Sequence, residues 1–461
     1  MIAEPSSSAT PFADAARRTP EQPSQALLRS GVRGESGLPL VGHSLGFLFD
    51  TQATMDRLRE RHGPDFRMQI FGMPFFVVGS PDAVRDAFLD RDKNFSSRLG
   101  WSVAIGKLFA RGLMLLDFEE HKVDRRIMQT AFRTDAMRGY VNMMNPPIRA
   151  AGSRVSQRFL FYPWIKQLTL DMASRIFLGL ELGADSERLN RAFSDAVAAS
   201  VAYVKHEVPG LSFARGMRGR RVLESYFRGL VKERRGKQGN DLFSELCHAQ
   251  SDRGERFSDD SIVDHMIFLM MAAHDTTTST LTAIVHCLLA YPEWQERIRA
   301  EVRARGDVPL TWDEREALPT LDRVFDETLR LFPPVPFITR RNLRPWKVGE
   351  VEVPANTALM ISSLVTHRLP QYWKDPSRFD PDRFLPERAE HSVHSHAYYP
   401  FGGGSHICLG MHFARFQVKA VLNELLFRHR IVPDGPMPKD RFISVPIPRP
   451  RDNLPVRLEA L

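Results

Sequence analysis

The sequence predicts a mainly α-helical protein with a small β portion, and three observations lead to this fold class. Apolar residues recur at helical spacing through most of the chain. Runs rich in β-branched and aromatic residues occur mainly at 66–80 and 346–363. There is neither an internal repeat nor the alternation of strands and helices that builds a parallel sheet. The 461 residues suffice for one large domain or for about two or three ordinary ones.

The expected elements follow one another along the chain. The first 34 residues are rich in Ser, Ala and Pro, so we expect a flexible amino-terminal tail over 1–34. Residues 66–80 divide into two β-rich runs around Gly72, which indicates a hairpin, and Pro81 begins the next element. Helices are expected over 51–62, 81–90, 117–133, 164–179, 185–205, 221–236, 258–290, 292–304, 311–331 and 409–429.

The segment 258–290 predicts an unusually long helix. Ser258 can cap its start, and Asp259 lies in the first turn, where the helix dipole favours negative charge. Pro292 ends the pattern. Because the mean helix has only about 11 to 12 residues, we expect this one to cross the whole domain. Its interior charged residues would be costly in lipid, so it does not read as a membrane span.

Composition limits the classes of partner and the cellular location. The formal net charge is +8, but the basic residues are scattered, and we expect no nucleic-acid partner. The first residues lack the apolar run of a signal peptide or membrane anchor. Three cysteines cannot form a disulfide framework, and Cys247 and Cys287 lie in helical surroundings typical of small buried hydrophobes. These observations favour a cytoplasmic location.

Five consecutive hydroxyl residues, 276–280, lie in the middle of the long helix. Such residues are poor helix formers, because their side chains compete for backbone hydrogen bonds. One interpretation is a polar stripe bonded to carbonyl groups one turn back. The other is functional, since Ala272 and Ala273 are small neighbours of the acid and alcohol pair Asp275 and Thr276 and leave room for a large flat group.

Glu327 and Arg330 are three residues apart on a predicted helix, which places a carboxylate and a guanidinium on one face. An exposed pair of this kind is common and stabilises little. The Pro- and Arg-rich segment 379–388 supplies Arg383, which could complete an Arg–Glu–Arg cluster. We expect this cluster to be structural and to fix a loop.

The third cysteine, Cys408, has different neighbours. It lies in the stretch FGGGSHICLG, residues 401–410, immediately before a predicted helix. Backbone amides and a helix N-terminus stabilise a thiolate, which suits a metal ligand. Zinc is a poor candidate, since no second Cys or His lies nearby at ligand spacing. Haem iron needs only one protein ligand.

These separated motifs together resemble the cytochrome P450 family of haem-thiolate monooxygenases, over roughly residues 35–460. The family patterns are Phe-x-x-Gly-x-x-x-Cys-x-Gly, Glu-x-x-Arg, Pro-x-Arg-Phe and Ala-[Ala/Gly]-x-[Asp/Glu]-Thr-Thr. They match 401–410, 327–330, 381–384 and 272–277 in the family's order. The resemblance, to soluble bacterial members in particular, implies one domain over 35–461 with the long helix lying over haem b.

The resemblance also implies roles for single residues. Cys408 would ligate the iron, and Phe401 would shield its sulfur. Asp275 and Thr276 would relay protons to dioxygen. Contacts to the cofactor are implied for His121, Arg125, Ala272, Ala273, Arg340 and His406, with Arg341 as the neighbouring alternative to Arg340.

The implied reaction is the insertion of one oxygen atom from O2 into a hydrophobic small molecule such as a terpenoid, steroid, fatty acid or aromatic. A haem-thiolate peroxygenase or isomerase and a non-catalytic haem-binding sensor are the alternatives. Neither needs proton delivery, so the intact Asp275 and Thr276 pair argues against both. Electrons would come from a separate acidic ferredoxin and its reductase.

The resemblance implies a substrate pocket and a docking surface for the ferredoxin. His265 shares the face of Thr276 and could bond a substrate oxygen, although a satisfied core histidine is the commoner arrangement. The ferredoxin would approach near Cys408. The expected pocket residues are Phe268, Leu269, Val335, Phe337, Ile338 and Ile447, and the expected docking residues are Arg126, Arg133, Arg415 and Lys419.

Overall fold

The computed structural model describes residues 22–109, 111–179, 184–200, 202, 205–237, 239–438, 442–445 and 447–460. Most of the expected tail, residues 1–21, lies outside this part of the chain. Residues 22–34 are packed, because Leu27 is fully buried and Gly34 bridges to Arg67 beside the first strand. The packed domain therefore begins before residue 35, which corrects the expected boundary.

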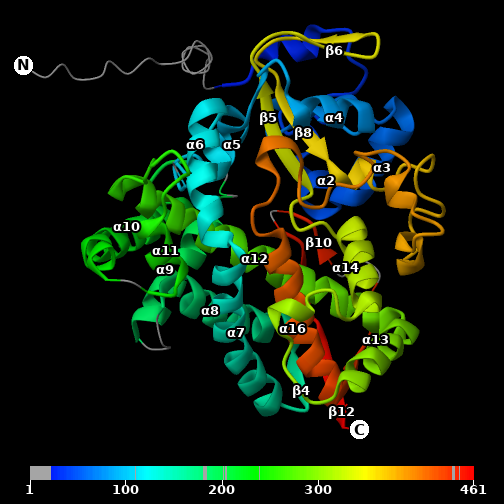
Figure 1. Cartoon of the computed structure of the whole chain (residues 1–461). Helices are drawn as coiled ribbons and strands as arrows, with labels where there is room; N and C mark the ends of the chain where they lie inside the picture. Colours follow the sequence, from blue (N-terminus) through cyan, green and yellow to red (C-terminus); the bar gives the residue numbers. More distant parts are fainter. Residues whose placement is uncertain are drawn as a thin grey trace, which may run out of the picture.

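Helices dominate the described chain and surround one central helix, α12 (Figure 1). The α-helices are α2 Ser44–Phe49, α3 Thr51–His62, α4 Pro81–Leu89, α5 Ser97–Ile105, α6 Phe118–Gln129, α7 Thr134–Arg154, α8 Phe161–Leu178, α9 Ala184–Ala199, α10 Ser212–Gly236, α11 Leu242–His248, α12 Asp259–Ala290, α13 Pro292–Arg305, α14 Pro319–Leu331, α15 Ser363–Thr366 and α16 Met411–Arg428. Short 3-10 helices include Gln25–Arg29, Leu113–Leu115, Thr130–Phe132, Trp312–Glu314, Pro381–Phe384, Glu390–Ser392 and Gly404–His406.

Most strands form a larger sheet beside α2 to α4 and a smaller sheet at the opposite end, where the carboxyl terminus lies (Figure 1). The pairs β6-β7 and β10-β11 form separate two-stranded sheets. The larger sheet has the order β1-β2-β8-β5-β3, and the smaller one β4-β12-β9. The strands are β1 Phe66–Ile70, β2 Met73–Val78, β3 Phe95–Ser96, β4 Arg158–Leu160, β5 Phe337–Asn342, β6 Trp346–Val348, β7 Val351–Val353, β8 Ala358–Ser362, β9 His429–Pro433, β10 Phe442–Ile443, β11 Arg449–Pro450 and β12 Pro455–Ala460.

The expected hairpin is the antiparallel pair β1 and β2, with Phe66 opposite Val77. Its turn needs a left-handed backbone at Phe71, with a φ of 50°, and at Gly72, with a φ of 76°. β8 joins β2 in parallel, and β5 joins β8 antiparallel. This pairing places β5, which carries Arg340, between β8 and β3 in the larger sheet.

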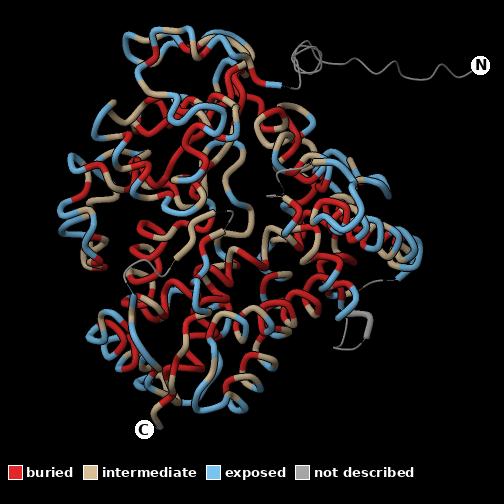
Figure 2. The backbone as a smooth tube through the Cα atoms, turned by 180° about the vertical axis from the view of Figure 1, so that it is seen from behind, coloured by how far each residue is buried: buried red, intermediate tan, exposed pale blue. Residues whose placement is uncertain are grey.

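The central helix α12 begins as the sequence predicts, because the Ser258 hydroxyl accepts a hydrogen bond from the Ser261 amide at 3.2 Å. Its apolar side chains join the largest buried cluster, and buried segments follow the interior of the molecule in Figure 2. The hydroxyl run adopts the arrangement of a polar stripe. Thr276, for example, donates to the Ala272 carbonyl one turn back at 2.8 Å.

Several elements differ from the sequence expectation for physical reasons. α7 was not expected, because Pro146 and Pro147 interrupt its pattern although both lie inside the helix. α10 begins at Ser212 rather than 221. Gly216 and Gly219 look like helix breakers in the sequence, but they let α10 approach α9, since a Cβ at either position would lie 2.2 Å from an α9 atom.

Two further differences concern residues 311–342. The helix expected over 311–331 divides into a short 3-10 turn and α14, because Pro319 occupies the first position of α14. Strand β5 was not expected. Among the described helices, none combines the length and hydropathy needed to cross a bilayer.

Candidate active site

The predicted Arg–Glu–Arg cluster is present and fully buried. Arg330 donates to both carboxylate oxygens of Glu327, at 2.7 and 2.8 Å, and Arg383 donates to the same carboxylate at 3.1 Å. The Asp380 amide adds a fourth hydrogen bond at 2.9 Å. Arg383 also bonds Glu390 at 2.6 Å. Helix α14 is thereby joined to the loop that precedes the cysteine stretch.

The loop that carries Cys408 is held from two sides. The Cys408 amide donates to the Phe401 carbonyl at 2.9 Å, which closes the loop before α16. Gly404 has a φ of 61°, and a Cβ there would lie 1.8 Å from the Phe88 carbonyl oxygen of α4. Phe401 stacks on Phe325 of α14, with ring centroids 6.2 Å apart. The loop therefore needs glycine where it meets α4 and an aromatic ring where it meets α14.

The Cys408 thiol is accessible to solvent, yet protein atoms surround it closely enough to affect its ionisation. Burial raises the thiol pKa, whereas a hydrogen bond from the Gly410 amide and the charge of Arg125 lower it, and the net pKa lies above its ordinary value. The Gly410 amide therefore acts in the direction that the sequence argument expects, but burial of the thiol outweighs it. A bound metal cation would supply the missing positive charge.

Four predicted donors gather beside this loop. The rings of His121, on α6, and His406 stack with centroids 3.8 Å apart. Burial and the charges of Arg125 and Arg340 lower the pKa of His121 to about 4, and burial with the charge of Arg340 lowers that of His406 well below its ordinary value. The two histidines are therefore neutral at physiological pH, while the two arginines bring positive charge to the site.

Arg340 belongs to this group, because its charge acts on both His121 and His406. Burial lowers the pKa of the Arg340 guanidinium to about 10, although the charges of Asp117 and Asp90 act in the opposite direction. Arg340 donates to the Thr339 carbonyl at 2.8 Å and forms no ion pair within the part of the chain that the structure describes. Arg341 follows it on β5, and its guanidinium lies 3.5 Å from the Asn356 side chain.

Asp275 and Thr276 are adjacent on α12 but face different neighbours. The Asp275 carboxylate turns toward α8, 3.7 Å from the Lys166 ammonium and 3.1 Å from Nδ1 of His274. Burial alone would raise the pKa of Asp275, but His274 and Lys166 bring it below the ordinary value, so the group is ionised at neutral pH. Thr276 keeps Ala272 as its hydrogen-bond acceptor. The sequence argument missed Lys166 because 108 residues separate it from His274.

With this geometry established, comparison with known proteins decides the family. A model of the family described as Cytochrome P450 matches residues 32–455, and a relative from Mycobacterium tuberculosis, "Putative cytochrome P450 136", is 41% identical over 450 residues, covering 93% of this chain and 88% of the relative. The chain belongs to the cytochrome P450 family.

Two further comparisons extend this result. The "Beta-amyrin 28-monooxygenase" of Kalopanax septemlobus is 25% identical, over 92% of this P450 chain and 91% of the relative. The solved structure titled "Retinoic acid bound cyanobacterial CYP120A1" superposes with a TM-score of 0.84 at 26% identity and covers 93% of this chain and 99% of that one. The fold is therefore that of a P450 along nearly the whole chain, and the protein is an oxidoreductase of the monooxygenase type.

The family implies a haem cofactor, and the donors at this site fit one. His121 Nε2 is buried, and it has no hydrogen-bond partner in the described part of the chain, although a buried polar group normally needs one. Arg125 and Arg340 are partly to fully buried beside it. A planar group with two carboxylates would satisfy these donors, and the Cys408 sulfur would meet its metal.

The predicted pocket residues are not all brought together. Phe268 and Leu269 are buried in the cluster around α12, but Phe337 stacks on Phe47, with ring centroids 5.3 Å apart, and belongs to the sheet core. This position corrects its expected place in the pocket. Ile338 packs toward the other sheet cluster, Val335 is 39% exposed, and Ile447 is half-buried.

His265 is arranged as a hydrogen-bonded histidine of the core and not as a residue that bonds a substrate oxygen. It is fully buried, and its Nε2 lies 2.9 Å from the Asp124 carboxylate of α6. The aromatic ring of Phe257 packs against it, with centroids 4.8 Å apart. A role for His265 in bonding a substrate oxygen receives no support from this position.

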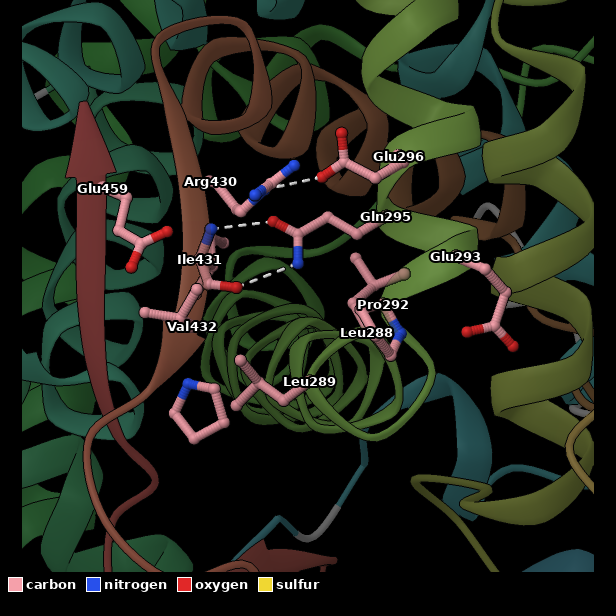
Figure 3. A pocket seen from close by; sticks show the side chains of 11 residues that line it. Leu288, Leu289, Pro292, Glu293, Gln295, Glu296, Arg430, Ile431, Val432 and Glu459 are labelled. Atoms are coloured by element: carbon pink, nitrogen blue, oxygen red, sulfur yellow. Dashed lines mark hydrogen bonds and ion pairs between the residues drawn. The ribbon is translucent and has the colours of Figure 1, made fainter. Parts of the chain in front are cut away.

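A pocket of about 470 Å³ lies elsewhere, between the end of α12, the start of α13, β9 and β12 (Figure 3). Leu288 and Leu289 form its apolar side, and Gln295 bonds both backbone groups of Ile431, at 2.7 and 2.9 Å. The 12 residues between Thr276 and Leu288 correspond to about 18 Å along the helix axis. This pocket is therefore separate from the candidate active site.

The expected docking residues need correction. Lys419 is fully buried, and its ammonium bonds Asp322 at 2.7 Å, so it cannot contact a partner. Arg415 bonds Asp326 at 2.7 Å, and Arg126 bonds Glu255 at 2.9 Å. Arg133 has a side chain that is 67% exposed, and it remains the accessible cation of the set.

Proposed function

We propose that this P450 inserts one oxygen atom from O2 into an apolar small molecule, with electrons supplied by a separate ferredoxin and its reductase. The observation that carries this proposal is the position of Cys408 next to four donors, His121, Arg125, Arg340 and His406, which have no carboxylate partner among the residues that the structure describes. Haem b, bound through Cys408, would activate dioxygen when electrons arrive.

The chain's own residues would hold this group in three ways. Cys408 would supply the sulfur ligand, with the Gly410 amide directed at it and Phe401 covering the loop. Arg125 and Arg340 would bind the two carboxylates, and the neutral histidines would donate N–H groups to them. Small residues of α12, Ala272 and Ala273, would leave room for the flat face.

Proton delivery would depend on the acid and alcohol pair of α12. The Thr276 hydroxyl uses its proton in the bond to Ala272, and its oxygen can accept a hydrogen bond from a water molecule on the other side. Asp275 is ionised and lies 3.7 Å from Lys166. The Lys166 side chain is 32% exposed, so this pair connects Asp275 to solvent. A proton taken up by Asp275 could therefore pass through water to Thr276.

The substrate is most simply an apolar molecule of the isoprenoid type, such as a terpenoid or steroid. Phe268 and Leu269 supply apolar surface on α12. The names of two relatives support this class, since one acts on β-amyrin and one binds retinoic acid, both isoprenoids. Fatty acids and aromatics are the remaining apolar candidates.

The test compares Thr276→Ala and Asp275→Asn with the parent protein in a reconstituted electron-transfer system. Thr276→Ala should still bind haem and consume reduced cofactor, but release hydrogen peroxide in place of product, because the proton is no longer directed. Asp275→Asn should slow the whole cycle. Unchanged product and peroxide yields in both variants would reject the relay and favour the peroxygenase or isomerase alternative.

A substrate screen completes the test. Apolar compounds are titrated into the holoprotein, and a shift of the Soret band reports entry beside the iron. Terpenoids and steroids should produce saturable shifts, whereas charged sugars and nucleotides should not. Saturation by polar compounds alone would contradict the proposed substrate class.

A further inference from the structure

A buried histidine and an acid join the central helix to α6. His265, in the second turn of α12, is fully buried, and its Nε2 lies 2.9 Å from the Asp124 carboxylate of α6. A carboxylate accepts hydrogen bonds, so the histidine nitrogen donates in this contact. The ring of Phe257 packs against His265, with centroids 4.8 Å apart. Two neighbours therefore hold the imidazole in place.

Stability alone does not explain why a histidine occupies this position. His265 Nδ1 is also buried, and within the described ranges of the chain it has no hydrogen-bond partner. A buried polar pair that is only partly satisfied stabilises a fold little, and well-packed apolar residues of similar volume often do as well. The role of His265 is therefore better sought in what Asp124 would contact if the histidine were absent.

Asp124 lies among the residues that are proposed to bind the cofactor. It follows His121 by three residues, which places both on one side of α6, and it directly precedes Arg125. Burial and the charge of Arg125 lower the pKa of His121, whereas the charge of Asp124 raises it. The Asp124 carboxylate is thus close enough to act on the His121 ring even while His265 holds it.

The His121 ring is ready to bind a second carboxylate. Its Nε2 is buried, and no residue of the described chain supplies a hydrogen-bond partner for it. A buried donor in this condition gains free energy from any acceptor that reaches it, and an ionised carboxylate is the strongest kind. Without His265, Asp124 would be free to turn toward His121. It would then compete with the carboxylate of the cofactor for the same N–H group.

We propose that His265 is a positioning residue for the cofactor site, because it holds Asp124 away from His121 and so keeps the His121 N–H group available for a cofactor carboxylate. The inference rests on the proposed cofactor site and goes beyond it, since His265 acts through Asp124 and not by contact with the cofactor. The histidine that the sequence suggested as a substrate contact thereby serves cofactor binding instead.

α6 has a second attachment beside this one, which provides a matched control. Arg126, two residues after Asp124, bonds Glu255 at 2.9 Å, and Glu255 also accepts from the Ser251 hydroxyl at 2.8 Å. Breaking this pair removes an attachment of α6, but the acid that it leaves behind keeps Ser251 and belongs to another segment. Arg126→Gln therefore separates the loosening of α6 from the release of Asp124.

The rate of haem loss from the holoprotein measures the effect. Each holoprotein is mixed with an excess of apomyoglobin, and the transfer of haem is followed at the Soret band. His265→Leu should lose haem about tenfold faster than the parent protein, a factor that corresponds to about 1.4 kcal/mol, because Asp124 occupies the His121 N–H group. Arg126→Gln should lose haem at the parental rate. Equally fast loss in Arg126→Gln would assign the effect to a loosened α6 and overturn the proposal.

Rescue at Asp124 gives the sharper test. The variant that combines His265→Leu with Asp124→Asn has no charged competitor, so its haem loss should return close to the parental rate. His265→Gln keeps a donor near the position of Nε2 and should also behave like the parent. If His265→Leu yields no holoprotein, His265→Asn, whose side chain is too short for this contact, takes its place. Fast haem loss that persists after Asp124→Asn would show that the imidazole acts by packing, and it would overturn the proposal.

His121→Phe distinguishes this inference from the proposed cofactor site. Haem loss should already be fast in that variant, and adding His265→Leu should accelerate it no further, because the donor for which Asp124 competes is absent. Further acceleration would reject the inference alone. Haem loss at the parental rate in His121→Phe would reject His121 as a cofactor donor, and the inference with it.

Discussion

Removal of the Glu327 carboxylate should be among the most destabilising single changes in the protein. Glu327 accepts hydrogen bonds from Arg330, Arg383 and the Asp380 amide, and the three charged side chains are at most 1% exposed. Breaking a buried ion pair by removing one partner costs about 3 to 5 kcal/mol. Arg383 keeps Glu390, at 2.6 Å, whereas Arg330 keeps the carbonyl groups of His367 and Pro376. We therefore expect about 4 kcal/mol for Glu327→Ala.

The measurement is equilibrium urea unfolding, followed by far-ultraviolet circular dichroism, together with the haem content after purification. Because the total stability of a typical domain is about 5 to 15 kcal/mol, Glu327→Ala should give little folded holoprotein. Glu327→Gln keeps the shape of the side chain and one acceptor oxygen, so its stability should lie between that of Glu327→Ala and that of the parent protein. Asp313→Ala, which breaks an exposed pair with Arg138, should cause no measurable change. A Glu327→Ala protein with parental stability and altered products would show that the cluster is not structural.

Three other outcomes follow from the site and its surroundings. Cys408→Ala should abolish the carbonyl spectrum of a thiolate-ligated haem, while Cys287→Ala, at a buried helical position, should keep it; a normal spectrum without Cys408 would exclude it as ligand. Burial raises the pKa of Asp90 from 3.8 to about 7, so its contribution to stability is full below about pH 3.8 and is lost as pH rises through 7. Asp90→Asn should flatten that part of the stability profile, measured as urea midpoints between pH 4 and 8, and an unchanged slope would contradict the assignment. Arg133→Glu should raise the KM for reduced ferredoxin, whereas Lys419→Met should lower stability without changing that KM. A raised KM in Lys419→Met with an unchanged KM in Arg133→Glu would restore Lys419 as a docking residue.

The fold class and the cysteine loop could be predicted from the sequence because their signals are local. The helical periodicity, the turn at Gly72 and the glycines around Cys408 all act within a few residues. α7 and the first part of α10 were missed because proline and glycine usually end helices, whereas Pro146 and Gly216 lie inside them. In the case of Gly216, contact with α9 outweighs the local preference.

The candidate site shows the same division between local and long-range information. Spacing placed Glu327 and Arg330 on one face, but it could not show that Lys166 would meet Asp275 or that Phe337 would turn toward Phe47. Lys419 illustrates the limit for charge. A lysine in a helix is usually exposed, and only the tertiary position of Asp322 explains why this one is buried.

The loop of Cys408 contacts both the core around the larger sheet and the core around the helices. Its Gly404 is pressed on Phe88, which belongs to the core of the sheet half, and its Phe401 rests on Phe325, which belongs to the helical half. A shift of Phe88 relative to Phe325 would therefore disturb the loop that carries the sulfur. The absorption spectrum of a metal bound at Cys408 should consequently change when the contacts of this loop with Phe88 or Phe325 loosen. On mild heating, the spectrum should change before the helices unfold.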